Sequence, residues 1–352
     1  MTELGKRVRI NLNLVLAAVV IAAACGSAPT GAPGGETGPV TLRFGYFPNL
    51  THATALVGIK KNFLGSALGD NVTLDAHIFN AGPDEVAALL SNSLDAGFLG
   101  PNPAINAFVR SHGQAVRIIA GATSGGALLV VKPSIVAVAD LRGKKLADPQ
   151  LGGSQDVALR WFLQGKGFKT DAAGGGNVSI LPQDNATTLT AFRQGNIDGA
   201  WLPEPWASRL IVEAGAKVLV DERDLWPGGN FVTTNLIVRT DFLKSHPATV
   251  RKLLEGLYQA DDYLNTATAG AQVAANDSLA QITGRALATN VVSSAWPHLK
   301  FTLDPLAATL QASADHAQKV GQLDQVDLRG IYDLTLLNQV LAEHGQPAVK
   351  SR

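Results

Sequence analysis

The sequence has little cysteine and no excess of either charge. Cys25 is the single cysteine among 352 residues, so the chain beyond it has neither a thiol nucleophile nor a disulfide. Lys plus Arg and Asp plus Glu both number 29, which gives a formal net charge of zero. Because there is no basic excess and the Trp and Phe residues are scattered, we expect no binding of nucleic acid.

The motifs of several common enzyme classes are absent as well. The sequence has no G-x-S-x-G nucleophile turn and no H-E-x-x-H metal pair, and the "GGGN" at Gly174 lacks the lysine of a phosphate-binding loop. The seven histidines are spread singly along the chain, which argues against a metal cluster. We therefore expect a binding protein that is not an enzyme and that needs no metal and no cofactor.

The N-terminal apolar run is too short to span a membrane. It covers residues 12–24, whereas a spanning helix needs about 20 apolar residues. Basic residues precede it at 6–9, which is the order of an export signal. Three alanines then lead into Cys25, as in the lipoprotein signals of bacteria that this segment resembles, although such signals usually have leucine where this chain has Ala22. We predict a lipoprotein signal peptide over 1–25 with Cys25 lipidated; the alternative is an ordinary signal peptide with an incidental cysteine.

The segment after Cys25 cannot form a core. Residues 26–39, "GSAPTGAPGGETGP", are rich in Gly and Pro, a composition typical of a solvated tether. A tether behind a lipidated cysteine would hold a folded domain beside the cell membrane, outside the cytoplasm, without inserting the domain into it.

From residue 40 the sequence alternates short apolar runs with helical patterns, which indicates βαβ units and mostly parallel sheets. The alternation restarts near Ser134, and after "FVTTNLIVR" almost everything has helical spacing. The length is sufficient for two domains. We predict two α/β lobes, lobe 1 over 40–132 and 235–352 and lobe 2 over 133–234. Strand-like crossovers near 128–132 and 231–239 would form a hinge between them.

One sequence motif occurs twice, as "LDAGFLGPNP" from Leu94 and "IDGAWLPEPW" from Ile197. Two copies are too few for a solenoid. Each copy is expected to end a central strand and to start a helix whose free N–H groups point into a cleft between the lobes. The repeated aspartates, Asp95 and Asp198, are expected to bond backbone groups on the far side of their strands.

Four longer stretches carry a family resemblance: "GYFPNLTHATALVG", "FNAGPDEVAALLSNSLDAGFLGPNPAINAF", "GNIDGAWLPEPWASRL" and "DFLKSHPATVRKLLEGL". With them the chain resembles the periplasmic-type solute-binding proteins of bacterial ABC importers, in the branch that takes up sulfonates, taurine and nitrate. The resemblance implies a type II periplasmic-binding-protein fold of two α/β lobes joined by two crossovers. It also implies capture of a small solute by a monomer, which delivers it to a membrane permease driven by a separate ATPase.

The resemblance places the ligand at the loops that follow the strands. Our candidates from these loops are Asn49, Thr51, His52, Asn80, Asn102, Ser124, Ser154, Gln155, Asp156, Glu204 and Trp206. The set holds neutral donors and no Arg or Lys, which suits an ionised oxyanion such as a sulfonate. Trp206 is expected to contact the organic part of the solute. His52 could instead bond only its own backbone, and Ser154 could serve as a helix N-cap.

The two carboxylates in this set leave the ligand open. Beside an anion, Asp156 and Glu204 are repulsive unless they face away or pair with an amine of the ligand. A taurine-like zwitterion would satisfy both the neutral donors and the carboxylates. We expect an aliphatic sulfonate or a taurine-like compound. The alternatives are nitrate, a pyrimidine precursor of thiamin, an aromatic sulfur compound, or an enzyme built on the same fold.

Overall fold

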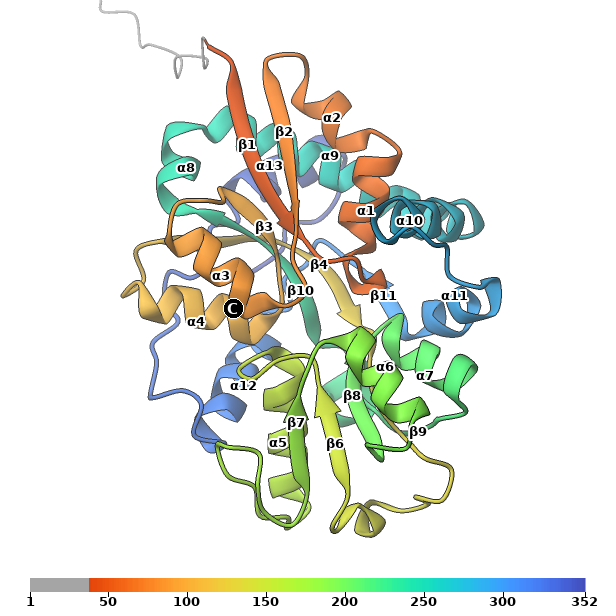
Figure 1. Ribbon diagram of the computed structural model, residues 1–352. Helices are drawn as coiled ribbons and strands as arrows, with labels where there is room; N and C mark the ends of the chain where they lie inside the picture. The colour runs from red at the N-terminus through yellow and green to blue at the C-terminus, as the bar shows by residue number, and fades with distance from the viewer. Residues whose placement is uncertain (1–37, 352) are drawn as a thin grey trace, which may run out of the picture. The chain divides into compact units, whose positions relative to one another are not determined.

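The structure, a computed structural model that describes residues 38–351, contains two separate β-sheets (Figure 1). The predicted signal peptide, Cys25 and nearly all of the predicted tether lie outside the described residues. Within residues 38–351 no helix is both long enough and apolar enough to cross a membrane.

The first sheet has six strands in the order β11-β4-β10-β3-β1-β2. Strand β1 runs parallel to β2 and β3, whereas β10 is antiparallel to β3 and β4, and β11 is antiparallel to β4. The strands are β1 (Val40–Tyr46), β2 (Val72–Ile78), β3 (Ala96–Leu99), β4 (Val116–Gly125), β10 (Val232–Arg239) and β11 (Leu299–Phe301).

The second sheet has five strands in the order β7-β6-β8-β5-β9. Strand β6 is parallel to β7 and β8, and β5 is antiparallel to β8 and β9. The strands are β5 (Ala127–Val131), β6 (Lys145–Asp148), β7 (Ser179–Pro182), β8 (Gly199–Pro203) and β9 (Lys217–Asp221). Each sheet therefore combines parallel βαβ units with antiparallel strands, as in the predicted α/β fold class.

Helices cover both sheets. Those that follow strands of the first sheet are α1 (Ala53–Lys60), α2 (Phe63–Leu68), α3 (Gly82–Leu90) and α4 (Pro101–Arg110). Those that follow strands of the second are α5 (Ser154–Gly165), α6 (Asn185–Arg193) and α7 (Trp206–Ala214). The remaining helices are α8 (Thr240–Ser245), α9 (Pro247–Thr266), α10 (Thr268–Thr283), α11 (Thr289–Ala295), α12 (Ala307–Lys319) and α13 (Thr335–Glu343).

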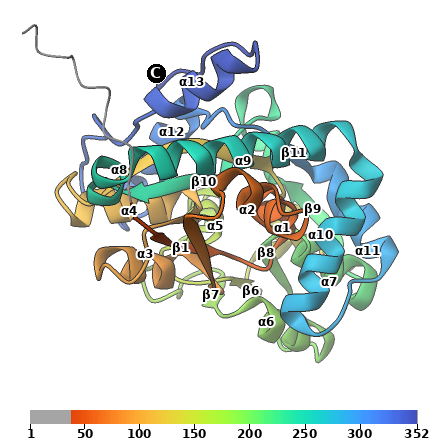
Figure 2. The same ribbon diagram turned by 90° about the horizontal axis from the view of Figure 1, so that it is seen from above.

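The C-terminal helices return to the first sheet, as the sequence predicts. Helix α9 packs on α1 and α2, α10 packs on α1, and α13 packs on α9; Figure 2 shows α9 beside α2. Helices α11 and α12 differ. Helix α11 packs on α7, which follows a strand of the second sheet, and α12 packs against both α4 and α5, which follow different sheets.

Alternating side chains on β5 show how the second sheet is covered on both faces. Leu128 and Val130 belong to one apolar cluster with residues of α6 and α7, whereas Leu129 and Val131 belong to another with Phe162 of α5. Successive side chains of a strand point to opposite faces, so an unbroken apolar run fits a strand covered by helices on each side.

The passages between the sheets lie elsewhere than the sequence predicts. The chain leaves the first sheet at Gly125 and Gly126, which have φ of 75° and 76°, and enters the second at once in β5. Positive φ at two successive residues strongly favours glycine, and it turns the chain sharply between β4 and β5. Strand β5 thus pairs in the second sheet although it falls in the predicted range of lobe 1. The chain returns to the first sheet between β9 and β10. The division of the chain into lobe 1 and lobe 2 remains a prediction.

Candidate ligand-binding site

A pocket with about 470 Å³ of empty volume, part of it open to solvent, lies where the strand ends of the two sheets meet. From the first sheet, segments 47–52, 80–82 and 100–103 line it after β1, β2 and β3. From the second, segment 149–155 and Asn185 line it after β6 and β7, together with Pro203 at the end of β8. All six are carboxyl ends of strands in the parallel parts of the sheets, which is where open α/β sheets bind ligands.

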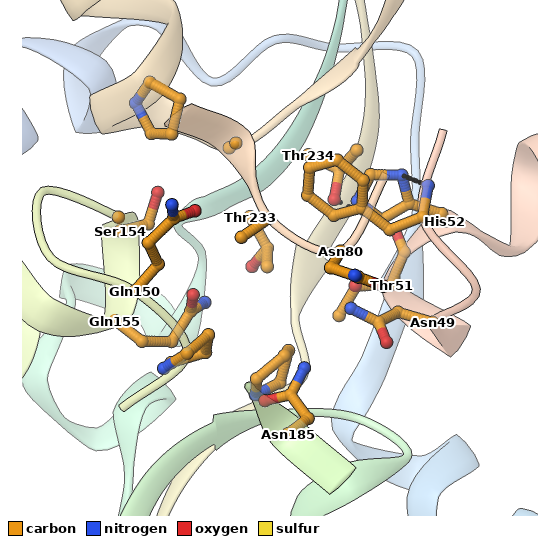
Figure 3. Close-up of a pocket in the computed structure, with 18 residues that line it drawn as sticks. Asn49, Thr51, His52, Asn80, Gln150, Ser154, Gln155, Asn185, Thr233 and Thr234 are labelled. Carbon is orange, nitrogen blue, oxygen red and sulfur yellow. Dashed lines mark hydrogen bonds between the residues drawn. The ribbon is translucent and has the colours of Figure 1, made fainter. Parts of the chain in front are cut away.

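The pocket brings together six of the eleven candidate residues. Figure 3 shows Ser154 and Gln155 on one side and the candidates from the first sheet on the other, with Asn185 below them. The six are Asn49, Thr51, His52, Asn80, Ser154 and Gln155. That they contact a ligand remains a prediction.

The pocket has no charged wall. Among the described residues that line it, none is Asp, Glu, Lys or Arg. Burial lowers the pKa of His52 to about 3, so its imidazole is neutral. Its Nδ1 accepts the N–H of Phe47 at 3.2 Å, which leaves the ring proton on Nε2 as a donor. His52 therefore both bonds a nearby backbone group and lines the pocket.

Three helices of nine or more residues have their first residue in the pocket wall. Gly82 starts α3, Ser154 starts α5 and Asn185 starts α6. The first N–H groups of a helix have no partner within it and carry partial positive charge, so they favour an anion. Ser154 is not the N-cap that the sequence suggests, because Gly153 is the N-cap of α5. The Oγ of Ser154 instead lies 3.4 Å from the N–H of Asn102, which follows β3 of the first sheet.

Two side-chain amides of the pocket wall have unpaired oxygens. Gln150 Oε1 and Asn185 Oδ1 are buried without a hydrogen-bond partner within residues 38–351. Buried polar atoms are rarely left unpaired, so these two acceptor oxygens suit a donor group of a guest or a water molecule, whereas an oxyanion needs the N–H groups of the wall. By contrast, the hydroxyls of Thr233 and Thr234 already donate to the carbonyl oxygens of Gly125 and Thr51, at 2.5 and 2.9 Å.

Both candidate carboxylates face away from the pocket. Asp156 accepts Arg160 Nε at 2.7 Å, and its other oxygen accepts the N–H of Gly152 at 3.0 Å and the amide of Gln322. Glu204 accepts both the N–H and the hydroxyl of Ser208, at 3.0 and 2.9 Å, and burial raises its pKa to about 7. Of the two alternatives, carboxylates that face away and a carboxylate that pairs with a ligand amine, the first holds for this pocket.

Three further candidates also lie outside this pocket. The Asn102 amide donates to Ser313 O at 3.1 Å and lines a neighbouring cavity. Ser124 Oγ accepts the Phe231 N–H at 3.2 Å. Trp206 Nε1 donates to Asn49 Oδ1 at 2.9 Å, and its ring lies under the guanidinium of Arg209. Trp206 thus positions Asn49 across the two sheets and does not itself line the pocket.

The duplicated motif forms β3–α4 and β8–α7, so that each sheet contains the strand of one copy. Asp95 Oδ2 accepts the N–H of Arg43 at 3.0 Å, and Asp198 Oδ2 accepts the N–H of Lys145 at 2.9 Å. Both aspartates precede their strands and so lie away from the pocket. Their predicted role of bonding backbone groups is confirmed.

Some lining residues are missing from the sequence prediction. Gln150 and Asn185 follow β6 and β7, so a polar residue after a predicted strand is the signal that could have found them. Thr233 and Thr234 lie inside antiparallel β10 and carry no comparable signal. Phe47 follows β1 directly and resembles a core residue.

Comparisons with known proteins give the family and the fold of the chain. The NMT1-like family matches residues 35–277. The taurine-binding periplasmic protein of Escherichia coli K12 is 29% identical over 188 residues, which is 53% of this chain and 56% of that protein. The alkanesulfonate-binding protein SsuA from Xanthomonas axonopodis pv. citri, bound to MOPS, superposes with a TM-score of 0.66 at 23% identity, over 82% of this chain and 96% of that one.

The periplasmic nitrate-binding protein NrtA from Synechocystis PCC 6803 gives a TM-score of 0.73 at 13% identity, over 89% of this chain and 92% of that chain. These likenesses confirm the predicted periplasmic-binding-protein fold.

Proposed function

Because this chain belongs to the NMT1-like family, we propose that it is an extracytoplasmic solute-binding protein of an ABC importer. It captures a small organic oxyanion, an aliphatic sulfonate first of all, in the pocket between its two sheets and delivers it to the permease and its ATPase. Relatives named for binding taurine and alkanesulfonates support this assignment. The observation that carries it is a pocket built from the strand ends of both sheets and lined by uncharged donors.

The donor set suits an anion without a counter-charge in the wall. A hydrogen bond to a charged group contributes about 1.5–3 kcal/mol. Four or five such bonds, from side-chain amides, the His52 Nε2–H and helix-terminal N–H groups, are sufficient for binding at roughly micromolar concentration after the cost of association. The hinge between the lobes would allow an open and a closed arrangement of the two sheets. A solute that bridges both sheets favours the closed arrangement, because it contacts both walls only there.

The same wall argues against a cation inside this pocket. An ammonium group held there would meet no carboxylate, since Asp156 and Glu204 are bonded elsewhere. Considering this pocket by itself, we therefore propose that an alkanesulfonate binds there in preference to taurine. Lipidation of Cys25 and a monomeric state belong to the proposal as well; the anchor is supported by the basic, apolar and small residues that precede Cys25.

Titration calorimetry with ethanesulfonate and with ethyl methyl sulfone, its uncharged analogue, tests the proposed function. The sulfonate is expected to bind with a dissociation constant of roughly micromolar order and the sulfone about 100-fold more weakly, because charge-assisted hydrogen bonds are about twice as strong as neutral ones. Mass spectrometry should recover the sulfonate unchanged. Tighter binding of nitrate than of ethanesulfonate, or equal binding of the sulfone, would contradict the proposal.

A further inference from the structure

Asn49 lies in the pocket wall with one end of its side chain bonded outside the pocket. The residue is 4% exposed, and Figure 3 shows it beside Thr51 and Asn80. Its Oδ1 accepts the indole N–H of Trp206 at 2.9 Å, and Trp206 does not line the pocket. In the described part of the chain, Nδ2 of Asn49 has no hydrogen-bond partner. The donor end of this amide is therefore free for a ligand.

The indole N–H determines which end of the Asn49 amide is free. An amide has one acceptor oxygen and two N–H donors, and its two ends have nearly the same shape. An indole N–H can only donate, so it must meet the oxygen of Asn49. A flipped amide would set two donors against each other at Trp206 and would turn Oδ1, an acceptor that repels an oxyanion, toward the pocket. The Trp206 N–H thus holds Asn49 in its donor orientation.

Trp206 is itself held in place. It is the first residue of α7, and the guanidinium carbon of Arg209 lies 4.4 Å from the centre of its ring. Glu204 fixes the turn before α7, because its carboxyl group accepts the N–H and the hydroxyl of Ser208, at 3.0 and 2.9 Å. An indole that is fixed in this way can orient a partner at little further cost in conformational entropy.

The main chain of the same segment holds the loop that carries Asn49. The carbonyl oxygen of Glu204, directly after β8, accepts the N–H groups of Leu50 and Thr51 at 3.0 and 3.4 Å. Together with the indole bond, three hydrogen bonds join residues 204–206 to residues 49–51. The Asn49 side chain is therefore placed relative to the second sheet as well as to its own strand.

We propose that Trp206 determines the specificity of the pocket for an oxyanion by holding the Asn49 amide with its Nδ2 protons toward the ligand, an inference that rests on the proposed function. Trp206 is a positioning residue that acts through Asn49 alone. Without the indole N–H, a sulfonate bound to Nδ2 would leave Oδ1 buried and unpaired, which is costly. An uncharged ligand loses less, because the bond with Nδ2 that it can forgo is weaker.

Titration calorimetry on the full chain with Trp206→Phe, Asn49→Ala and the double variant tests the proposal. Phenylalanine keeps an aromatic ring against Arg209 but deletes the N–H. Trp206→Phe is expected to weaken binding of ethanesulfonate about 10-fold and of ethyl methyl sulfone about threefold, so the sulfonate-to-sulfone ratio falls about threefold. Asn49→Ala should weaken sulfonate binding at least as much. The double variant should bind the sulfonate as Asn49→Ala does, because Trp206 acts only through the Asn49 amide.

Trp226→Phe is the matched control. The Trp226 indole donates to Glu222 at 3.4 Å, and neither residue is among the described ones that line the pocket, so sulfonate affinity should stay within about twofold. Additive losses in the double variant, or unchanged affinity in Trp206→Phe, overturn the proposal while the proposed function stands. If Trp206→Phe does not fold, Asn49→Ala decides: an unchanged sulfonate-to-sulfone ratio overturns the proposal, and a fall supports it. If the wild-type protein binds no sulfonate, the proposed function fails and this inference fails with it.

Discussion

Replacing Arg160 with methionine is expected to lower the free energy of unfolding by about 3–5 kcal/mol. Arg160 is 2% exposed, and its Nε donates at 2.7 Å to Asp156, which is fully buried. Methionine fills much of the same volume but leaves the Asp156 carboxylate without its counter-ion. Asp148 lies beside this pair and is itself an acid, whose pKa burial raises, so it cannot replace the lost cation. Urea unfolding followed by circular dichroism measures the change.

Arg209→Met is the matched control for that experiment. Arg209 and Glu213 form an ion pair with the same helical spacing, at 2.8 Å, but both side chains are 24% exposed. Solvent screens such a pair, so its loss should cost less than about 1 kcal/mol. Equal losses in the two variants would show that burial of the Asp156–Arg160 pair does not govern its contribution.

Replacing Gln155 with glutamate is expected to weaken sulfonate binding by roughly 100-fold or more, because two like charges about 5 Å apart at a partly buried site repel by about 3 kcal/mol. Gln155 lines the pocket in the first turn of α5, and glutamate has nearly the same shape. At this helix end a carboxylate is favourable to the fold, by about 0.3–1 kcal/mol. Stability and affinity should therefore change in opposite directions, which calorimetry and thermal unfolding of the same sample can show.

Gln164→Glu supplies the control on the same helix. Gln164 is exposed near the other end of α5, far along the helix from the pocket, so sulfonate affinity should stay within about twofold. Unchanged affinity in Gln155→Glu would mean either that the ligand is not an anion or that it does not reach the start of α5.

The placement of the pocket at strand ends could be predicted from the sequence, whereas the direction of each side chain there could not. Ser154, Gln155 and Asp156 are consecutive, and a helix turns by about 100° at each residue, so they cannot all face one pocket. The first two line it, and the third turns inward to Arg160. Which of the three turns inward depends on the helix orientation, which tertiary packing sets.

Side-chain hydrogen bonds between residues far apart in the chain could not be predicted from the sequence either. Trp206 begins a helix at the expected sheet edge, yet its indole is bonded to Asn49, more than 150 residues earlier in the chain. Glu222 follows β9 and reaches Trp201 on β8. No local pattern marks such pairs. The sequence did contain a signal for the passage between the sheets, since the glycine pair at 125 and 126 lies in a short break between two apolar runs.

Sulfur anomalous scattering from a crystal grown with ethanesulfonate tests most directly whether the pocket between the sheets binds an oxyanion. The protein has one methionine and one cysteine, Met1 and Cys25, and both lie outside residues 38–351. A sulfur peak among these described residues can therefore only be the ligand. We predict one peak within hydrogen-bonding reach of Asn80, Gln155 and the starts of α3 and α5. A peak on the outer surface of either sheet, or none at saturating sulfonate, would contradict the account.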